Sequence, residues 1–253
     1  GKIRQRLWKI RAKKVIIATG SIERPLIFNN NDRPGIILSS SIKKYIDYYG
    51  IKCGKKLSLF TNNDSAYETA ISLNNSGVNV NSIIDIREKS NSSIVKQAEK
   101  LGIKIHWKHT VVNTKGYKRI NSIEIMKLSD DGSAVVDSKI NKSCDCLGIS
   151  GGWTPMVHLF TQSGGKLKFK DTDNIFVPDK DSSDLISIGS CNGDFELDDL
   201  LQNSNRSVKN FLNIHNSDYD NLKTTCSKET NKKNIWLLPS DKQLGKTKPF
   251  LDF

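Results

Sequence analysis

The stretch Lys13-Lys14-Val15-Ile16-Ile17-Ala18-Thr19-Gly20-Ser21-Ile22-Glu23-Arg24-Pro25 decides the fold. Its apolar run, Val15 to Ala18, is β-branched, too short for a buried helix, and bounded by charge before it and by Gly and Pro after it. These features predict a strand that is buried on both faces, as in a parallel sheet. A parallel strand that ends in Thr19-Gly20 is typical of a dinucleotide-binding fold, because a residue without a side chain lets the backbone pass close to a pyrophosphate.

A second strand of this type comes much later, at Cys146-Leu147-Gly148-Ile149-Ser150-Gly151-Gly152. Either strand alone indicates only a core strand followed by a turn, but the two in this order indicate a nucleotide-binding domain interrupted by another domain. We therefore predict an α/β fold with two Rossmann-like dinucleotide-binding domains, one inserted in the other, the first being incomplete at its N-terminus. The predicted bounds are 1–34 and 151–214 for the first domain, 52–150 for the inserted domain, and 215–253 for a tail toward a downstream domain.

Composition limits the classes of function. The chain has 253 residues, of which 36% are hydrophobic and 26% charged, and no apolar run approaches the ~20 residues of a membrane span. No signal peptide precedes the first residues, so we expect a cytoplasmic protein without a membrane partner. The first residue is Gly1, which indicates a fragment or a processed chain. The formal charge of +12 comes from scattered lysines and arginines, so no nucleic-acid partner is expected.

The cysteines predict neither a metal site nor a redox site. There are five, an odd number, and no pair of them has the CxxC spacing: Cys53, Cys144, Cys146, Cys191 and Cys226. We interpret them as structural thiols in a reducing compartment. No catalytic residue is predicted in this chain.

The inserted domain begins with a βαβ unit. The pattern predicts a strand over Leu57–Phe60, a helix over Asp64–Ser76 and a second strand over Val78–Asp85. The turn after the first strand, where an intact unit carries Gly-x-Gly-x-x-Gly, reads Thr61-Asn62-Asn63-Asp64-Ser65-Ala66. Asp64 is a good N-cap but would repel a pyrophosphate. We therefore predict that the inserted domain does not bind NAD in the usual way, and that Asp85 is a strand-end residue rather than a ribose ligand.

Shorter elements surround this unit. Residues 91–102 predict a helix, 103–107 a strand, and 110–140 a meander of short strands. The alternating basic and apolar residues of Gly1–Arg11 predict a β-hairpin arm, and Ile235–Pro239 predicts a brief strand. The last parallel strand lies within Asp184–Gly193, and a helix follows from about Phe195 to Ile214.

The strand ends of the first domain predict the cofactor site. Thr19 and Gly20 should face Gly189–Gly193 across a crevice, because parallel strands of one sheet end at the same edge. The helix that begins near Phe195 should direct its free N–H groups toward the same place.

Several motifs, in one order over nearly the whole chain, resemble the alpha subunit family of heterotetrameric sarcosine oxidase. They are Arg6-Leu7-Trp8-Lys9-Ile10-Arg11-Ala12-Lys13, Ala18-Thr19-Gly20-Ser21-Ile22-Glu23-Arg24-Pro25, Phe60-Thr61-Asn62-Asn63-Asp64-Ser65-Ala66-Tyr67, Ser150-Gly151-Gly152-Trp153-Thr154-Pro155 and Gln162-Ser163-Gly164-Gly165-Lys166-Leu167. The third motif is specific, since it stands where most similar folds carry the glycine fingerprint.

The resemblance implies a central FAD/NAD(P)-binding region similar to pyridine nucleotide-disulfide oxidoreductases. In that family a tightly held NAD occupies the first domain, FAD belongs to the beta subunit, FMN lies at the interface with the beta subunit, and a tetrahydrofolate-binding domain follows. The complex converts sarcosine, oxygen and tetrahydrofolate into glycine, hydrogen peroxide and methylenetetrahydrofolate. The implied partners are the beta subunit and the other subunits of the heterotetramer, and the isolated chain is expected to be inactive.

The resemblance also extends the expected NAD site. Ser190 stands where flavin-binding relatives often carry an Asp, and Asn192, Leu197 and Asp199 would line the pocket. The alternative for Leu197 and Asp199 is that they pack and cap the helix. The complete set of expected cofactor-binding residues is Thr19, Gly20, Gly189, Ser190, Asn192, Gly193, Leu197 and Asp199.

Two other classes of function remain open. One is a free-standing NAD(P)H-dependent flavin oxidoreductase of the thioredoxin-reductase type, which would need a CxxC pair or an intact glycine fingerprint. The other is a non-catalytic structural module that holds a partner subunit.

Overall fold

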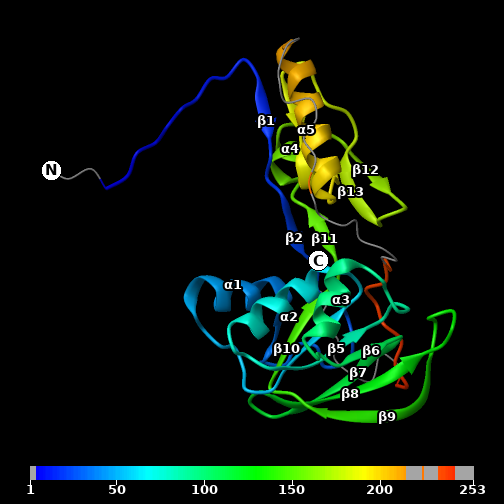
Figure 1. Cartoon of the computed structure of the whole chain (residues 1–253). Helices are drawn as coiled ribbons and strands as arrows, with labels where there is room; N and C mark the ends of the chain where they lie inside the picture. The colour runs from blue at the N-terminus through cyan, green and yellow to red at the C-terminus, as the bar shows by residue number, and fades with distance from the viewer. Residues whose placement is uncertain (1–3, 215–223, 225–232, 243–253) are drawn as a thin grey trace. The chain divides into compact units, whose positions relative to one another are not determined.

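The computed structural model describes residues 4–214, 224 and 233–242 (Figure 1). These residues fall into two compact units, which we call unit 1, within residues 1–22 and 154–226, and unit 2, within residues 23–153 and 227–253. The chain passes between them at β2 (Ser21–Glu23) and β11 (Trp153–Pro155), which pair with each other. The domain bounds inferred from the sequence stay a prediction.

Unit 2 contains a five-stranded parallel sheet of order β3-β10-β4-β5-β6. Its strands are β3 (Ile36–Leu38), β10 (Cys146–Ser150), β4 (Leu57–Thr61), β5 (Val80–Asp85) and β6 (Ile105–Trp107). Every residue of β4 and β10 is buried, which explains why these strands are apolar runs without alternation.

Different layers cover the two faces of this sheet (Figure 1). Three helices pack on one face: α1 (Ser39–Tyr49), α2 (Ser65–Asn75) and α3 (Ser93–Lys100). An antiparallel meander packs on the other: β7 (His109–Gly116), β8 (Ile120–Leu128) and β9 (Val135–Ser143). Within β4, Leu57 and Leu59 point to the helices and Phe60 to the meander, as the two-residue period of a strand requires.

Unit 1 is smaller and more open. Strand β1 (Val15–Ile17) pairs in parallel with β14 (Leu185–Ser187), and β12 (Leu167–Lys170) pairs antiparallel with β13 (Ile175–Pro178). The helices are α4 (His158–Gln162), the short 3₁₀ helix η1 (Gly189–Asn192) and α5 (Leu197–Leu212). Its buried apolar cluster is Ile17, Phe160 and Cys191, with Leu167 and Leu185 packed against it.

The structure confirms the α/β class, the parallel sheet and the βαβ unit, and it corrects three local predictions. Strand β1 is not buried on both faces: Val15 and Ile16 are 42% and 39% exposed, and among the described strands β1 pairs with β14 alone. Residues 4–14 form neither helix nor strand, so the predicted hairpin arm is wrong there: Leu7, Trp8 and Ile10 are at least 73% exposed and pair with no described strand. Ile235–Pro239 forms only one isolated bridge, between Leu237 and Ile27. An alternating sequence forms a strand only where a neighbour accepts its backbone hydrogen bonds.

Within the described ranges, none of the helices combines the length and apolar character that crossing a membrane requires.

Candidate functional site

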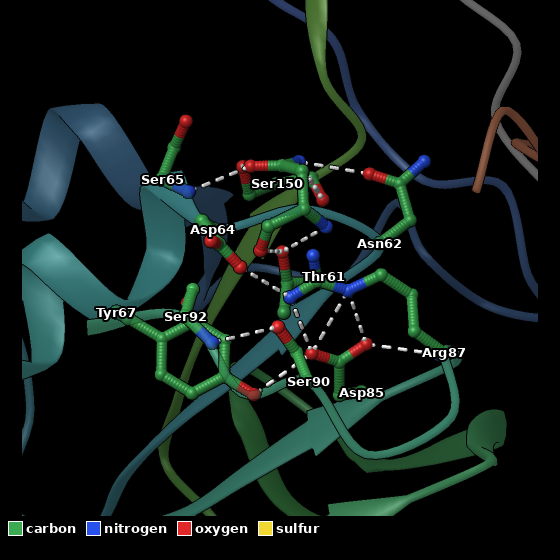
Figure 2. A network of polar contacts seen from close by, with 11 residues as sticks. Thr61, Asn62, Asp64, Ser65, Tyr67, Asp85, Arg87, Ser90, Ser92 and Ser150 are labelled. Atoms are coloured by element: carbon green, nitrogen blue, oxygen red, sulfur yellow. Dashed lines mark hydrogen bonds and ion pairs between the residues drawn. The ribbon is translucent and has the colours of Figure 1, made fainter. Parts of the chain in front are cut away.

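The carboxyl ends of the parallel strands of unit 2 meet at three polar residues. The register places Ser150 of β10 beside Thr61 of β4, and Thr61 beside Asp85 of β5. Open α/β sheets bind their ligands at this edge. In unit 2 the edge is filled by side chains of the chain itself (Figure 2).

A buried arginine lies at the centre of this edge. The Arg87 side chain is 1% exposed, and its Nη2 lies 2.9 Å from Asp85 Oδ2 and 2.8 Å from Asp64 Oδ1. Its Nε and its backbone N–H both donate to Asp85 Oδ1, at 3.1 and 2.9 Å. The Tyr67 hydroxyl donates to Asp85 Oδ2 at 2.8 Å, so four donors converge on one carboxylate. We call Asp64, Tyr67, Asp85 and Arg87 the buried charge cluster.

The charges in this cluster depend on one another. Asp85 and Asp64 raise the pKa of Arg87 against the effect of burial, so the guanidinium stays charged. Burial raises the pKa of Asp85, while Arg87 and the Tyr67 hydroxyl act in the opposite direction. The pKa of Tyr67 is raised by burial and by Asp85, which keeps its hydroxyl a donor. A buried ion pair of this kind is tolerated only when its remaining hydrogen bonds are made.

Thr61 and Asn63 stand at the positions of the two leading glycines of the fingerprint, and Asn62 lies between them. Asn63, 1% exposed, donates to Ser150 Oγ at 3.1 Å and to the Ser150 carbonyl at 3.2 Å, and its Oδ1 accepts the Ser65 N–H at 2.8 Å. Asn62, 2% exposed, donates to the carbonyls of Gly151 and Ile235 at 3.3 and 3.1 Å. The turn that would hold a pyrophosphate is therefore hydrogen-bonded to its own protein.

The residues of this edge do not fit a dinucleotide. Two carboxylates, Asp64 and Asp85, stand where a phosphate would need donors, and the cation between them, Arg87, is paired with both. The expectation that the Asp64 side chain caps α2 is wrong. Asp64 occupies the N-cap position without a side-chain cap hydrogen bond, because its carboxylate binds Arg87 instead.

The predicted cofactor site lies in unit 1, at the ends of β1 and β14. The Ile188 N–H donates to the Ile17 carbonyl at 2.9 Å, and the Cys191 thiol lies 3.4 Å from the same oxygen, so η1 is anchored to the end of β1. A Cβ on Gly20 would lie 3.9 Å from Ser190 Oγ. The structure thus brings Thr19 and Gly20 next to η1, which begins with Gly189 and Ser190.

The three glycines of this site have different surroundings. Gly20 and Gly189 have φ values of +78° and +74°, and a Cβ on either would make only ordinary van der Waals contacts, at 3.8 Å or more. A Cβ on Gly193 would come within 2.9 Å of Val177 Cγ1. Gly193 is therefore required by packing against β13, whatever its relation to a ligand.

The other expected residues lie around the start of α5. Asn192 is exposed, Leu197 is 43% exposed, and Asp199 lies in the first turn. The first turn also contains Asp198, and the N-cap residue is Glu196. The carboxylates of these acids are stabilised by the positive N-terminal end of the helix dipole, and their negative charge would repel a phosphate at that end. They can, however, accept hydrogen bonds from the hydroxyl groups of a ligand.

Near these acids, Asp194 accepts a hydrogen bond from Asn203 Nδ2 at 3.0 Å, and partial burial raises its pKa. Among the described residues, no group of His, Cys, Asp and Glu has the arrangement of a metal site. The described cysteines are free, and burial raises the pKa of Cys144 and Cys146 to about 11 and about 12.

Comparison with known proteins matches this chain to one kind of enzyme subunit. It is 34% identical over 198 residues to sarcosine oxidase subunit alpha of Corynebacterium sp. (strain P-1), a match that covers 78% of this chain and 20% of the relative. It is 36% identical over 178 residues, 70% of the chain and 18% of the relative, to the same subunit of Corynebacterium sp. (strain U-96). The chain is a relative of the sarcosine oxidase alpha subunits.

The comparisons also show how much of each relative the chain covers and which solved structures have a similar fold. The chain spans about a fifth of the length of the sarcosine oxidase alpha subunits it matches. No protein-family model matches it. Solved structures with a similar fold include Lactococcus lactis thioredoxin reductase (TM-score 0.57, 18% identity, 80% of this chain and 67% of that one) and Mycobacterium tuberculosis FprA in complex with NADPH (TM-score 0.54, 13% identity, 79% and 63%). These likenesses confirm the predicted FAD/NAD(P)-binding fold.

Sequence reasoning missed three residues of unit 2 that the structure places at the strand ends or over them: Asn63, Arg87 and Trp236. The loss of the glycine fingerprint showed that the turn had changed. It did not show what had replaced the ligand, because Arg87 follows a strand by two residues and has the pattern of an exposed charge.

Proposed function

We propose that this chain is the dinucleotide-domain region of a sarcosine oxidase alpha subunit, holding NAD in unit 1 and docking the flavin-bearing beta subunit. The observation that carries the proposal is the 34–36% identity to alpha subunits over 64–78% of the chain. The complex would demethylate sarcosine oxidatively to glycine, with hydrogen peroxide and methylenetetrahydrofolate as the other products. FMN would lie at the interface with the beta subunit, and FAD and tetrahydrofolate would bind elsewhere in the complex.

In this proposal the NAD-binding domain comprises 1–34 and 151–214, the inserted domain is 52–150, and 215–253 leads to the next domain. Thr19, Gly20, Gly189 and Ser190 would lie against the dinucleotide backbone, since a Cβ on either glycine would meet no atom closer than 3.8 Å. Asn192, Leu197 and Asp199 would line the pocket, and Gly193 would hold the turn against Val177. The acids of α5 suit ribose hydroxyls, so we place the pyrophosphate nearer Gly20 and Gly189.

NAD supplies a hydride-accepting ring when it is bound, and this chain would bind and orient it. No residue here is assigned a catalytic role, and the protein is expected in the cytoplasm and inactive without its partners. A free-standing NAD(P)H-dependent flavin oxidoreductase is the weaker alternative, because the edge of unit 2 is filled by the buried charge cluster and the described cysteines include no CxxC pair. The filled edge is also what a non-catalytic structural module would show.

The test is to purify the chain, tagged, from its natural host together with whatever it binds. We expect a beta-type flavoprotein subunit to copurify, sarcosine-dependent hydrogen peroxide formation by the complex, and release of NAD on denaturation. Gly20→Ala should lower the NAD content without loss of the beta subunit. Gly164→Ala is the matched control, because Gly164 also has positive φ (+90°) and has no neighbour within 4 Å. A complex with full NAD content in the Gly20 variant would show that the pocket lies elsewhere.

A further inference from the structure

A segment from the far end of the described chain lies along the carboxyl ends of β4 and β10 in unit 2. We call Lys233–Leu238 the strap. The Lys233 N–H donates to the Asn62 carbonyl at 3.4 Å, and Asn62 Nδ2 donates back to the Ile235 carbonyl at 3.1 Å. The Trp236 indole N–H donates to the Gly151 carbonyl at 2.5 Å. The strap thus bonds to the residue that follows each of the two strands.

The strap is built into the unit and is not a loose cover. The Ile27 N–H donates to the Trp236 carbonyl at 2.7 Å, and the Leu238 N–H donates to the Ile27 carbonyl at 3.1 Å. Leu238 is 1% exposed and belongs to the core cluster that contains Leu26 and Phe28. Burial of this leucine side chain in the core stabilises the arrangement.

An arginine at this edge binds the strap. The guanidinium carbon of Arg24 lies 3.7 Å from the centroid of the Trp236 ring, and its Nη2 donates to the Trp153 carbonyl at 3.1 Å. Burial lowers the pKa of Arg24 to about 10. A cation stacked on an indole and bonded to a carbonyl is positioned by the protein and is not directed toward a phosphate.

We infer that the strap is the resident ligand of unit 2: a peptide segment of this chain occupies the strand-end crevice that takes a small molecule in related sheets. The inference rests on three features that agree. The Asn62 amide and the Gly151 carbonyl are hydrogen-bonded to the strap, Arg24 stacks on Trp236, and the neighbouring turn is closed by the buried charge cluster. Unit 2 therefore recognises a peptide with an indole side chain and does not bind a dinucleotide. This is independent of the proposal for NAD in unit 1.

The experiment replaces residues 233–238 of the full chain with glycine and serine and measures hydrogen–deuterium exchange by mass spectrometry. We expect hydrogen–deuterium exchange in segments 60–66 and 148–153 to accelerate roughly tenfold or more. In the unaltered chain, local opening of these segments must break the contacts with the strap, and in the variant those contacts are absent. A synthetic peptide of residues 233–242 should restore the protection, and NAD should not. Unchanged exchange after the replacement, no restoration by the peptide, or equal restoration by NAD would each overturn the inference.

Point variants keep the test valid if that replacement prevents folding. Trp236→Phe keeps a ring over Arg24 but loses the bond to Gly151, so exchange should rise in 148–153 and less in 60–66. Trp236→Ala should raise exchange in both segments. Trp8→Ala is the matched control, because Trp8 is 73% exposed, and it should leave both segments unchanged. Equal exchange in the Trp236 and Trp8 variants would contradict the assignment.

Discussion

The residues that follow the parallel strands differ between the two units: those of unit 2 are mutually bonded polar side chains, and those of unit 1 include glycines. In unit 2 the polar residues after β4, β5 and β10 bind one another and the strap, and the largest of them, Arg87, is 1% exposed. In unit 1 the residues after β1 and β14 include two glycines, beside which a Cβ would meet no atom closer than 3.8 Å, and small or exposed polar residues. The comparison shows that a Rossmann-like sheet can keep its framework while its ligand is replaced by side chains.

The replacement has a physical condition. A phosphate of a bound ligand is neutralised in part by counter-ions and water. A side-chain carboxylate buried in the same place needs a cation and hydrogen-bond donors from the protein itself. Arg87 provides that partner for Asp85 and Asp64, and Tyr67 and the Arg87 backbone supply further donors to Asp85. Satisfied networks of this kind are rigid, so we expect substitutions in unit 2 to change stability and those at the unit 1 strand ends to change ligand content.

Removing the central cation should give the largest effect. Arg87→Met leaves Asp85 buried without its counter-charge, and we expect the free energy of unfolding of unit 2 to fall by about 3–5 kcal/mol. Urea unfolding followed by circular dichroism measures this. Lys89→Met is the control, because Lys89 makes an exposed pair with Glu99 at 3.3 Å and should cost less than about 1 kcal/mol. A loss below about 1 kcal/mol for Arg87→Met would show that Asp85 is not charged in the folded protein.

The two units can be compared directly by replacing one asparagine in each and measuring the loss of stability. Asn63→Ala removes the donors to Ser150 and the acceptor for the Ser65 N–H, all at a site that is 1% exposed, and should cost about 2–3 kcal/mol. Asn192→Ala, at an exposed position of unit 1, should cost less than about 0.5 kcal/mol. Urea unfolding gives both values, and similar losses in the two variants would remove the contrast between the units.

The smallest expected effects are changes in the pH dependence of stability, which can be compared between a buried carboxyl group of unit 2 and one of unit 1. Glu23 of unit 2 is 5% exposed and accepts the Ser40 N–H at 2.7 Å, and burial raises its pKa above the ordinary 4.5. Its contribution to stability is complete below pH 4.5 and is lost as the pH rises through the raised pKa. Glu23→Gln should therefore stabilise the chain by about 1 kcal/mol at pH 7 and not at pH 4.

The counterpart in unit 1 is Asp194, whose pKa is also raised by partial burial. Asp194→Asn should stabilise the chain at pH 7 in the same direction but by less than about 0.5 kcal/mol, because solvent screens a half-buried group. Unfolding midpoints measured between pH 3.5 and 8 test both variants. A larger gain at acidic than at neutral pH would contradict the assigned direction.

Much of the framework could be predicted from the sequence because it depends on local signals. The βαβ unit Leu57–Asp85 has apolar strands, a helical period and a left-handed Gly77 after its helix, and the structure has each of these. Helix α1 (Ser39–Tyr49) ends before Gly50, whose φ of +63° lies in the left-handed region that a glycine adopts without strain. The missing glycines correctly pointed to an altered turn.

The remaining features depend on contacts between distant residues. Nothing local distinguishes Trp236 from any aromatic residue in a polar tail, and its partner Gly151 lies 85 positions away. Arg87 and Asp85 are close in the sequence, but the burial that makes their pairing important comes from the sheet and from α2. The prediction of a hairpin arm at the start of the chain was wrong for the same reason, since a strand forms only beside a neighbouring strand that its own sequence does not specify.

The buried charge cluster also constrains how this domain can evolve. Replacing Asp64 would leave Arg87 paired with Asp85 alone, whereas removing Arg87 first would leave two carboxylates without a cation. Removal of Arg87 alone therefore passes through uncompensated buried charges, and the strap would still lie over the strand ends. Conversion of this edge into a nucleotide site therefore requires several coordinated substitutions.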